Sequence, residues 1–240
     1  MKITKDINGI IFDVLEYKDN DLIVSVLSKE YGFMQLYVKG GAKVTSKSFY
    51  IIKQFNEITF DVSKLNIDSL SLYKSGTNIS VFDYTSLSYN QINACLLLAE
   101  LFNKIKEIDN FDYVKYYDFI KKYLESIKQN NNIYYLINLF LYNTLVILGA
   151  YPIIDKCVIC NNDNSIVGFD IENFGFVCKN CQSNAYILKD KVVLTTLYEI
   201  NNQELKSSSS KSSNKIIMNI LTNYLSENTG VNLVSRKYIY

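Results

Sequence analysis

Four cysteines near the middle of the chain constrain its fold more than any other feature of the sequence. They form two C-x-x-C pairs, Cys157 with Cys160 and Cys178 with Cys181, and seventeen residues separate the pairs. Two residues between paired ligands let one tight turn direct both sulfurs at a single point, and two such turns supply the four thiolates of a closed tetrahedral Zn²⁺ site. The spacing therefore predicts a structural zinc site, with no open position for a catalytic water.

Two disulfides or a redox-active pair are the competing interpretations of these cysteines. Disulfides persist in oxidising compartments, and residues 1–6 contain no apolar run of the kind found in a secretory signal. A redox C-x-x-C motif occurs singly, whereas this chain has two. We therefore favour zinc, and we expect a cytoplasmic protein in which the ion holds part of the chain together.

Residues 1–80 carry short β-rich runs. Five such runs predict strands, at residues 10–17, 22–27, 33–38, 57–62 and 70–76. Five short strands are too few for an immunoglobulin-type sandwich, but they fit a small closed barrel. We predict an OB-fold nucleic-acid-binding domain over residues 1–80, and an SH3-like barrel is the alternative that the pattern leaves open.

The segment between the third and fourth runs concentrates positive charge. Residues 31–56 contain no acidic side chain. The lysines of this window are Lys39, Lys43, Lys47 and Lys53. Because the net charge of the whole chain is only +1, attraction to a polyanion must come from a local excess of this kind. These lysines are therefore candidate DNA- or RNA-binding residues, and the alternative is an ordinary solvated loop.

Two further features of this window suit a nucleic acid. Gly40 and Gly41 remove side chains where a backbone could approach a phosphate. The aromatic residues that can offer faces for base stacking are Phe33, Tyr37, Phe49 and Tyr50. Their alternative role is to fill the core of the barrel.

After residue 80 the pattern changes to helical spacing, which predicts a helical domain over residues 81–240. Ser86 or Ser88 is expected to cap the first helix, and its apolar face is Ile92, Leu96, Leu97, Leu101 and Ile105. Further helices are predicted at 112–128, 133–150, 190–200 and 215–227. The helix predicted at 133–150 is apolar on nearly all sides, but it carries two asparagines and lacks flanking basic clusters. A buried core helix is therefore favoured over a membrane span.

The zinc module is expected over residues 153–186, inserted between helices. Runs at 166–170 and 174–177 predict the two arms of a hairpin, with one cysteine pair at a turn on each side. A serine-rich stretch at 207–213 predicts a mobile linker. The fifth cysteine, Cys95, stands alone within the first helix and is expected to be a buried, small apolar residue.

The chemistry available to the chain favours binding over catalysis. It has no histidine, which excludes a Ser-His-Asp or Cys-His arrangement and a histidine general base. We find no phosphate-binding loop, dinucleotide-binding fingerprint or nucleophile elbow. Arg236 is the only arginine, so nearly all positive charge is lysine, which contacts phosphate as a point charge and reads bases poorly.

This combination of a barrel, a helical domain and an inserted four-cysteine module resembles the RecO family of bacterial recombination mediators. The matching segments run in the family's order along the whole chain: 8–11 (NGII), 28–32 (SKEYG), 39–42 (KGGA), 46–47 (SK), 148–152 (LGAYP) leading to the first cysteine pair, and 231–236 (VNLVSR). Each segment is weak alone, and their joint order is specific.

The resemblance implies a protein of DNA repair and recombination that is not an enzyme. It implies binding to single- and double-stranded DNA, annealing of complementary strands, and partnership with RecR. It also implies binding to the C-terminal tail of single-strand-binding protein and help in loading RecA onto DNA coated by that protein. Lys39, Lys43 and Lys47 would contact DNA, the four cysteines would hold zinc, and a basic rim at Arg236 or Lys237 would meet the tail carboxylate. The expected location is cytoplasmic and nucleoid-associated.

Two other functions stay open at this point. The first is an RNA-binding OB protein with a structural zinc ribbon, which a preference for RNA and a lack of strand annealing would indicate. The second is a lysine- or carboxylate-dependent nucleotidyl or phosphoryl transferase. The absence of a phosphate-binding loop disfavours the second.

Overall fold

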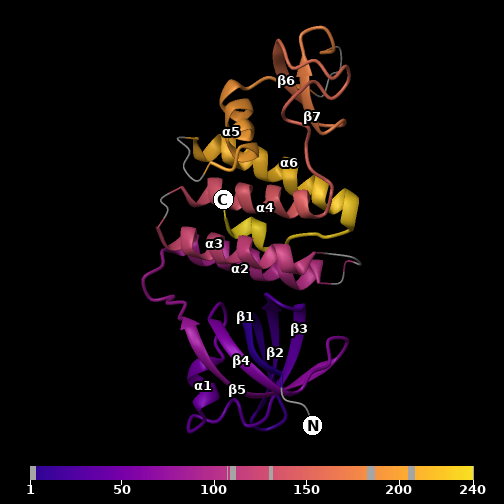
Figure 1. Ribbon diagram of the computed structural model, residues 1–240. Helices are drawn as coiled ribbons and strands as arrows, with labels where there is room; N and C mark the ends of the chain where they lie inside the picture. The colour runs from indigo at the N-terminus through magenta and orange to yellow at the C-terminus, as the bar shows by residue number, and fades with distance from the viewer. Residues whose placement is uncertain are drawn as a thin grey trace. The chain divides into compact units, whose positions relative to one another are not determined.

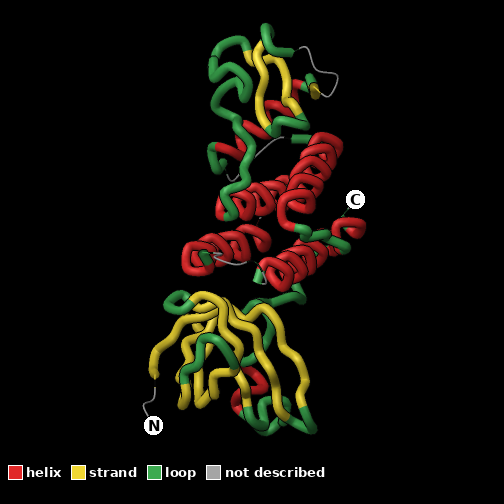
Figure 2. The backbone as a smooth tube through the Cα atoms, turned by 90° about the vertical axis from the view of Figure 1, so that its right-hand side faces the viewer, coloured by secondary structure: helices red, strands yellow, loops and turns green. Residues whose placement is uncertain are grey.

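The computed structural model describes residues 4–106, 108, 112–129, 132–182, 187–204 and 209–239. Contacts among the residues divide the chain into two compact units, Met1–Lys128 and Gln129–Tyr240. The first unit contains the barrel and the helices α1 to α3, and the second contains α4 to α6 with a small sheet (Figure 1, Figure 2). The division of the chain at residue 80 stays a prediction.

A closed five-stranded barrel forms the beginning of the first unit. Its strands are β1 (Thr4–Tyr17), β2 (Asp21–Ser28), β3 (Gly32–Val38), β4 (Glu57–Lys64) and β5 (Leu70–Ser80). They follow the order β1-β2-β3-β5-β4, and pairing of β4 with β1 closes the barrel. Only β3 and β5 pair in parallel among these strands. The prediction of an OB-fold barrel followed by a helical region with clustered cysteines is confirmed.

Alternation along the strands builds the barrel core. On β3, Met34, Leu36 and Val38 are buried in the core, whereas Gln35 and Tyr37 are only half-buried because they face outward. A register shift between Ile11 and Asp13 interrupts this alternation on β1. Such a shift lets neighbouring side chains leave the normal pattern. Ile11 is buried in the barrel core, whereas Phe12 lies outside that core and is fully buried because its ring stacks on Phe102.

Two helices cover one end of the barrel: α2 (Tyr89–Ile105) and α3 (Tyr113–Gln129) (Figure 1). Ser88 begins α2 with a capping box, as one of the two predicted caps. The ring of Phe12 stacks on Phe102 of α2, with 3.6 Å between ring centroids. The expected apolar face of α2 needs one correction, because Leu96 is 49% exposed and Leu98 is buried instead.

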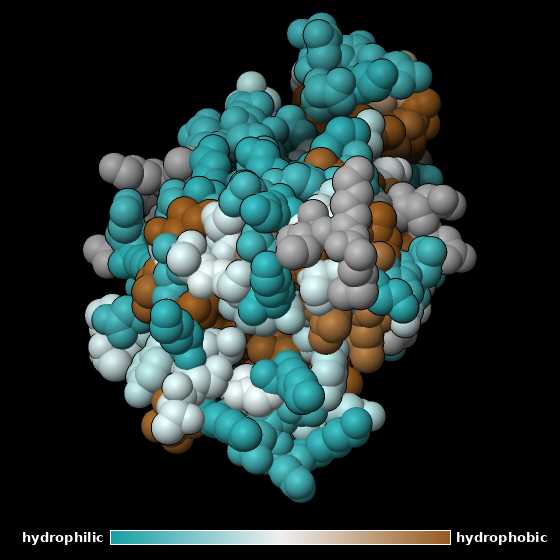
Figure 3. Space-filling view, turned by 60° about the horizontal axis from the view of Figure 1, so that its bottom comes forward, coloured by the Kyte–Doolittle hydropathy of each residue, from teal (hydrophilic) through white to brown (hydrophobic). Residues whose placement is uncertain are grey.

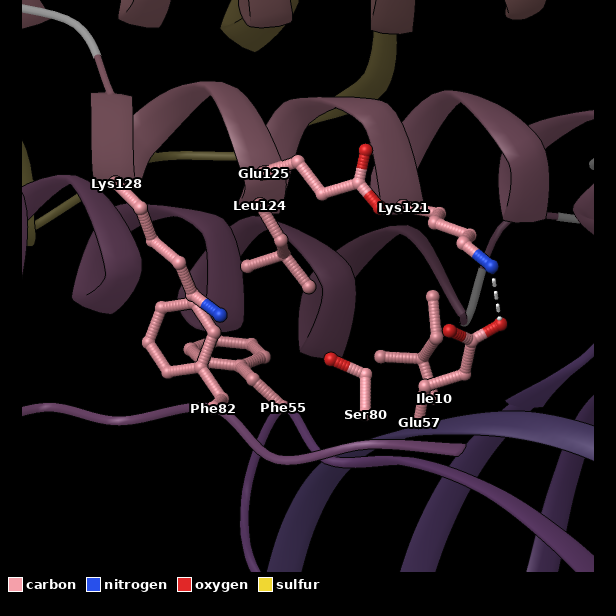
Figure 4. A pocket seen from close by; sticks show the side chains of 9 residues that line it. All are labelled: Ile10, Phe55, Glu57, Ser80, Phe82, Lys121, Leu124, Glu125 and Lys128. Carbon is pink, nitrogen blue, oxygen red and sulfur yellow. Dashed lines mark hydrogen bonds and ion pairs between the residues drawn. The ribbon is translucent and has the colours of Figure 1, made fainter. Parts of the chain in front are cut away.

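Polar contacts join α3 to the same end of the barrel. The Glu57 carboxylate accepts hydrogen bonds from the Tyr117 hydroxyl at 2.8 Å and from the Lys121 ammonium at 2.9 Å. The Lys128 ammonium lies over the Phe82 ring, 4.6 Å from its centroid. Figure 4 shows Glu57, Lys121, Phe82 and Lys128 among the side chains around a cavity of about 30 Å³. This cavity has room for about one or two water molecules.

The core of the second unit consists of α4 (Ile133–Ile147), α5 (Lys191–Asn201) and α6 (Lys211–Thr229), with the short 3₁₀ turn η1 (Ser235–Tyr238) after them. Nearly all of α4 is buried, as expected for a core helix. Gly149 follows it with φ +71°, a conformation that suits glycine at a helix end. Among the described residues, no helix has the length and apolarity needed to cross a bilayer.

The predicted serine-rich linker is wrong where the structure describes it. Ser210 caps α6 by accepting a hydrogen bond from the Ser213 N–H at 3.1 Å, so the helix begins at Lys211. Asn214, in the first turn, is fully buried and accepts a hydrogen bond from Asn138 of α4. Serine favours helix caps as well as linkers, and composition alone does not separate the two. Residues 207 and 208 of the predicted linker lie outside the described residues.

Candidate metal centre and nucleic-acid interface

The four predicted metal ligands lie together in the second unit. The sulfur atoms of Cys157, Cys160, Cys178 and Cys181 are all within 4.8 Å of one another. The sulfurs of Cys160 and Cys178 are 3.7 Å apart. A zinc–sulfur distance of about 2.3 Å places the sulfurs of a tetrahedral site about 3.8 Å apart. The four cysteines are therefore close enough to hold a metal ion.

Each cysteine pair is held at its own turn. In the first turn the Asn161 N–H donates to the Cys157 carbonyl at 2.8 Å, and Asn161 has φ +59°. In the second turn the Cys181 N–H donates to the Cys178 carbonyl at 3.1 Å. The strands β6 (Ile166–Asp170) and β7 (Gly175–Cys178) lie between the two pairs in the chain, and β8 (Ile187–Leu188) follows the second pair; they form one sheet with the order β7-β6-β8. Residues 183–186 of the predicted module lie outside the described residues.

The electrostatics of the cysteine cluster suit a cation. Burial opposes ionisation of the Cys157 thiol, but backbone N–H groups of Cys160, Cys178 and Ile159 stabilise its thiolate and lower its pKa to about 6. The pKa of Cys181 is raised to about 12, mainly by side-chain hydrogen bonds with Cys160 and Cys178. One thiolate thus forms readily while further ionisation is opposed. A divalent cation at the centre would remove that opposition.

The predicted nucleic-acid interface follows β3 on the barrel. Its residues form a turn and then a short helix, α1 (Lys47–Ile51), at the end of the barrel opposite α2 and α3 (Figure 1). All four lysines of the window are exposed: Lys39, Lys43, Lys47 and Lys53. We call residues 39–53 the lysine loop. Figure 3 views the molecule from this side, and hydrophilic side chains cover much of the surface there, with apolar side chains between them.

The lysines of this loop are available to a ligand. Within the part of the chain that the structure describes, Lys39, Lys43 and Lys47 form no ion pair. Lys53 lies over the ring of Phe49, with its ammonium 4.0 Å from the ring centroid. None of the four lysines thus forms a salt bridge with a described carboxylate, although Lys39 lies near enough to Asp21 to help lower the pKa of that carboxyl.

The two glycines of the loop have structural roles on the barrel itself, and their predicted approach to a phosphate stays a prediction. Gly40 has φ +64°, and its N–H already donates to the Asp21 carboxylate at 2.7 Å. A Cβ on Gly41 would lie 2.8 Å from a side-chain carbon of Val38 and 2.9 Å from one of Leu22. Turn geometry and packing against the barrel thus explain both glycines.

Asp21 is a residue of this interface that sequence reasoning missed. Its carboxylate accepts hydrogen bonds from the Tyr37 hydroxyl and from Gly40 N–H, which together hold the first turn of the loop. These bonds lower the pKa of Asp21 below its usual value, the hydroxyl contributing most. The strand register contained the signal, because Leu22 pairs with Val38 and so places Asp21 opposite Lys39.

The four aromatic residues of the window separate into different environments. The Phe33 ring packs against Phe102 of α2 and Tyr113 of α3, away from the lysines. The Tyr37 hydroxyl is engaged by Asp21. Phe49 and Tyr50 lie on α1, and Tyr50 is 65% exposed. Of these four residues, the two on α1 lie within the lysine loop itself, and Tyr50 is the most exposed of the four.

Of the two basic residues near the carboxyl end, Arg236 contacts a residue that lines a hollow in the second unit. The Arg236 guanidinium donates to Thr222 at 3.0 Å and to Asn223 at 3.3 Å, and Lys237 is exposed. Asn223 also lines a hollow of about 260 Å³ between the β6–β7 turn and α6. On its floor the rings of Phe174 and Tyr224 stack.

Comparison with known proteins covers nearly the whole chain. The family model described as "Recombination protein O N terminal" matches residues 1–82, and the one described as "Recombination protein O C terminal" matches residues 88–237. A DNA repair protein RecO of Mesoplasma florum is 29% identical over 177 residues, which span 73% of this chain and 66% of that protein. A DNA repair protein RecO of Halalkalibacterium halodurans is 24% identical over 96% of this chain and 92% of its own length. Another from Mycoplasma mycoides is 26% identical over 92% of this chain and 89% of its own length.

Proposed function

The chain belongs to the recombination protein O (RecO) family, and from this premise we propose that it binds single- and double-stranded DNA during repair and anneals complementary strands. Membership of the family supports a role in DNA repair. The observation that carries the finer proposal is the lysine loop, whose exposed lysines stand in a window without a single acidic side chain. Such a surface suits the phosphates of a nucleic acid.

Annealing follows from contacts to phosphate alone. Lysines neutralise the phosphates of two strands at once, which raises the local concentration of each strand near its complement. Because the bases are not held by arginine or amide forks, their edges stay free to pair. Base pairing then supplies the driving force, so the proposed role needs no catalytic step and no sequence specificity.

Three protein partners belong to this proposal: RecR, single-strand-binding protein, and RecA as the protein that is finally loaded onto DNA. For the tail of single-strand-binding protein, we propose the hollow between the β6–β7 turn and α6. Its ring stack of Phe174 and Tyr224 suits an apolar side chain, and Arg236 lies beside it, hydrogen-bonded to Asn223. Arg236 would meet the carboxylate at the end of an acidic tail, although Glu227 also lines this hollow.

The ion proposed for the cysteine centre is zinc in a structural role. Four sulfur ligands complete the coordination of a tetrahedral site and leave no position for substrate or water. The ion would be held by the thiolates of Cys157, Cys160, Cys178 and Cys181. The bound ion would cross-link the two turns.

An annealing assay tests the proposed function. Complementary fluorescent DNA strands are mixed with the protein, either bare or coated with single-strand-binding protein, and duplex formation is followed by energy transfer. We expect faster annealing in both cases, and loss of the effect on coated strands when a peptide of the tail is added in excess. Unchanged annealing rates would refute the proposal. A clear preference for RNA of the same sequence, without annealing, would favour an RNA-binding role instead.

A further inference from the structure

Tyr50 differs in its exposure from the other three aromatic residues that were predicted to offer faces for base stacking. It is 65% exposed, whereas Phe33, Tyr37 and Phe49 are half-buried. Aromatic side chains of this size usually bury most of their surface in a core or an interface. An exposed ring within a cationic surface is therefore a candidate for contact with a ligand.

The helix that carries Tyr50 is fixed to the barrel. Ile52, directly after α1, is buried in the barrel core with 2% exposure. The side-chain amide of Asn56 donates to the Ile51 carbonyl at 3.1 Å, and Ser46 caps the other end of the helix. The Phe49 ring meets the Tyr50 ring edge to face, with centroids 5.3 Å apart and an interplanar angle of 83°. The ring of Tyr50 thus stands on a fixed support, and a ligand that stacks on it loses little ordering entropy.

Lysines precede and follow this aromatic pair in the chain. Lys47 precedes Tyr50 by three residues on α1, which places both on one face of the helix. Lys53 follows Tyr50 by three residues, and its ammonium lies 4.0 Å from the centroid of the Phe49 ring. A ligand that matches this pattern has a flat aromatic group between two anionic groups. An unpaired nucleotide within a single strand of DNA has that chemistry.

We propose that Tyr50 stacks on an unpaired base and so gives the lysine loop a preference for single-stranded over double-stranded DNA. The inference rests on the proposed DNA-binding function and adds a specificity that lysines alone lack. Lysines contact the phosphates of single strands and duplexes alike. The bases of a duplex are already stacked on their neighbours, so the Tyr50 ring has no free base face to meet there.

Binding of a fluorescent oligo-dT and of a duplex of equal length tests this preference with three variants. Replacing Tyr50 with Ala is expected to weaken binding of the single strand by about 5-fold to 100-fold, the usual range for one base–aromatic stack, and to leave duplex binding unchanged. Tyr50→Phe keeps the ring and is expected to bind as the unaltered protein does. Tyr89→Ala is the matched control, because Tyr89 is 68% exposed in the same unit but lies outside the lysine loop.

Stacking can also be observed directly, because the chain contains no tryptophan. A Tyr50→Trp variant then has a single indole, whose fluorescence a stacked base quenches. We expect quenching by oligo-dT, and none by an abasic strand of equal length or by the duplex. In a Tyr89→Trp control none of the three ligands should quench the signal.

The outcomes separate this inference from the proposed function. If the unaltered protein binds neither strand form, the proposed function fails, and this inference with it. If it binds DNA, but Tyr50→Ala retains full affinity for oligo-dT and the indole fluorescence of the Tyr50→Trp variant does not respond, the stacking inference is overturned while the DNA-binding proposal stands. Equal loss of affinity for the single strand and the duplex would overturn the inference as well, because it would assign Tyr50 to the shape of the loop.

Discussion

At the scale of single residues, the lysine loop depends on a side chain of opposite charge. Asp21 ends the β1–β2 turn, and its carboxylate binds both Tyr37 and the backbone of Gly40. It contributes a negative charge close to the proposed interface, yet it also holds the turn that presents Lys39 and Lys43. Positioning the loop and increasing its charge are therefore opposing demands at this residue.

Replacing Asp21 with Asn is expected to destabilise the protein in a pH-dependent way. The pKa of Asp21 is lowered in the folded state, first by the Tyr37 hydroxyl and then by Gly40 N–H, so its stabilising effect is present above the unfolded value of 3.8. That effect is lost as the pH falls through the folded pKa. Urea unfolding of both proteins between pH 2 and pH 7 measures it: the difference in unfolding free energy should shrink toward acid pH. A difference that stays constant with pH would contradict this assignment.

The lysines themselves are testable as a group. Replacing Lys39, Lys43 and Lys47 with Ala is expected to weaken DNA binding on the order of tenfold and to lower the slope of log affinity against log salt by about 2, because fewer counterions are released. Fluorescence anisotropy at several salt concentrations measures both quantities. The control replaces Lys5, Lys64 and Lys74, which are exposed on the strands of the same barrel and change the net charge equally. Equal effects of the two triple variants would show that overall charge, not the loop, determines binding.

At the scale of elements, the small β6–β7–β8 sheet has little apolar core on the side of the cysteines. The cluster of buried residues there consists of Cys157, Val177 and Cys178, and two of these are proposed ligands. Phe169, Phe174 and Phe176 are buried outside this cluster, so the apolar contacts on the cysteine side are too few to hold the two turns without an ion. The sheet is therefore expected to depend on the ion, whereas α4 to α6 share an apolar core outside it.

Replacing Cys157 and Cys160 with Ser is expected to abolish metal binding and to open the β6–β7–β8 sheet. Atomic emission should find about one zinc per chain in the unaltered protein and none in the variant. Hydrogen exchange should show faster exchange in β6 and β7, while α4 keeps most of its protection. Cys95→Ala is the control, because Cys95 is buried in α2 and lies outside the cluster. Protein purified under reducing conditions without any metal would refute the zinc proposal.

At the scale of the whole molecule, the first compact unit extends beyond the barrel. Phe12 of β1 stacks on Phe102 of α2, and Glu57 of β4 binds Tyr117 and Lys121 of α3. Without these helices, the barrel would expose aromatic side chains that each contribute about 2 kcal/mol on burial. The helices α2 and α3 thus complete the barrel that would bind DNA.

A fragment of residues 1–128 is therefore expected to fold cooperatively and to bind DNA, whereas a fragment of residues 1–84 should aggregate or unfold at lower denaturant. Thermal melts and light scattering of both fragments measure the difference. The longer fragment should keep the affinity of the lysine loop for oligo-dT, because residues 39–53 lie wholly within it. Equal stability of the two fragments would mean that α2 and α3 contribute nothing to the barrel.

By itself the sequence determined the features that depend on neighbouring residues. Alternation predicted all five barrel strands, helical spacing and caps predicted α2 to α5 within a few residues, and the C-x-x-C spacing predicted which sulfurs meet. The positive charge of the lysine loop was also predicted, because it follows from counting the basic and acidic residues in the sequence. These properties are local, so a linear pattern carries them.

Only the tertiary structure decided which side chains meet across long separations in the chain. It placed Phe33 against Phe102 and left Tyr50 exposed, although both are aromatic residues of the same window. It also brought Asp21 to Gly40. Exposure and such pairings depend on how strands and helices pack, which no local pattern contains. The spacing of the four cysteines was enough to assign them to one metal centre. The aromatic residue that can meet a base was identified only from the structure, because its exposure depends on how the barrel and its two helices pack.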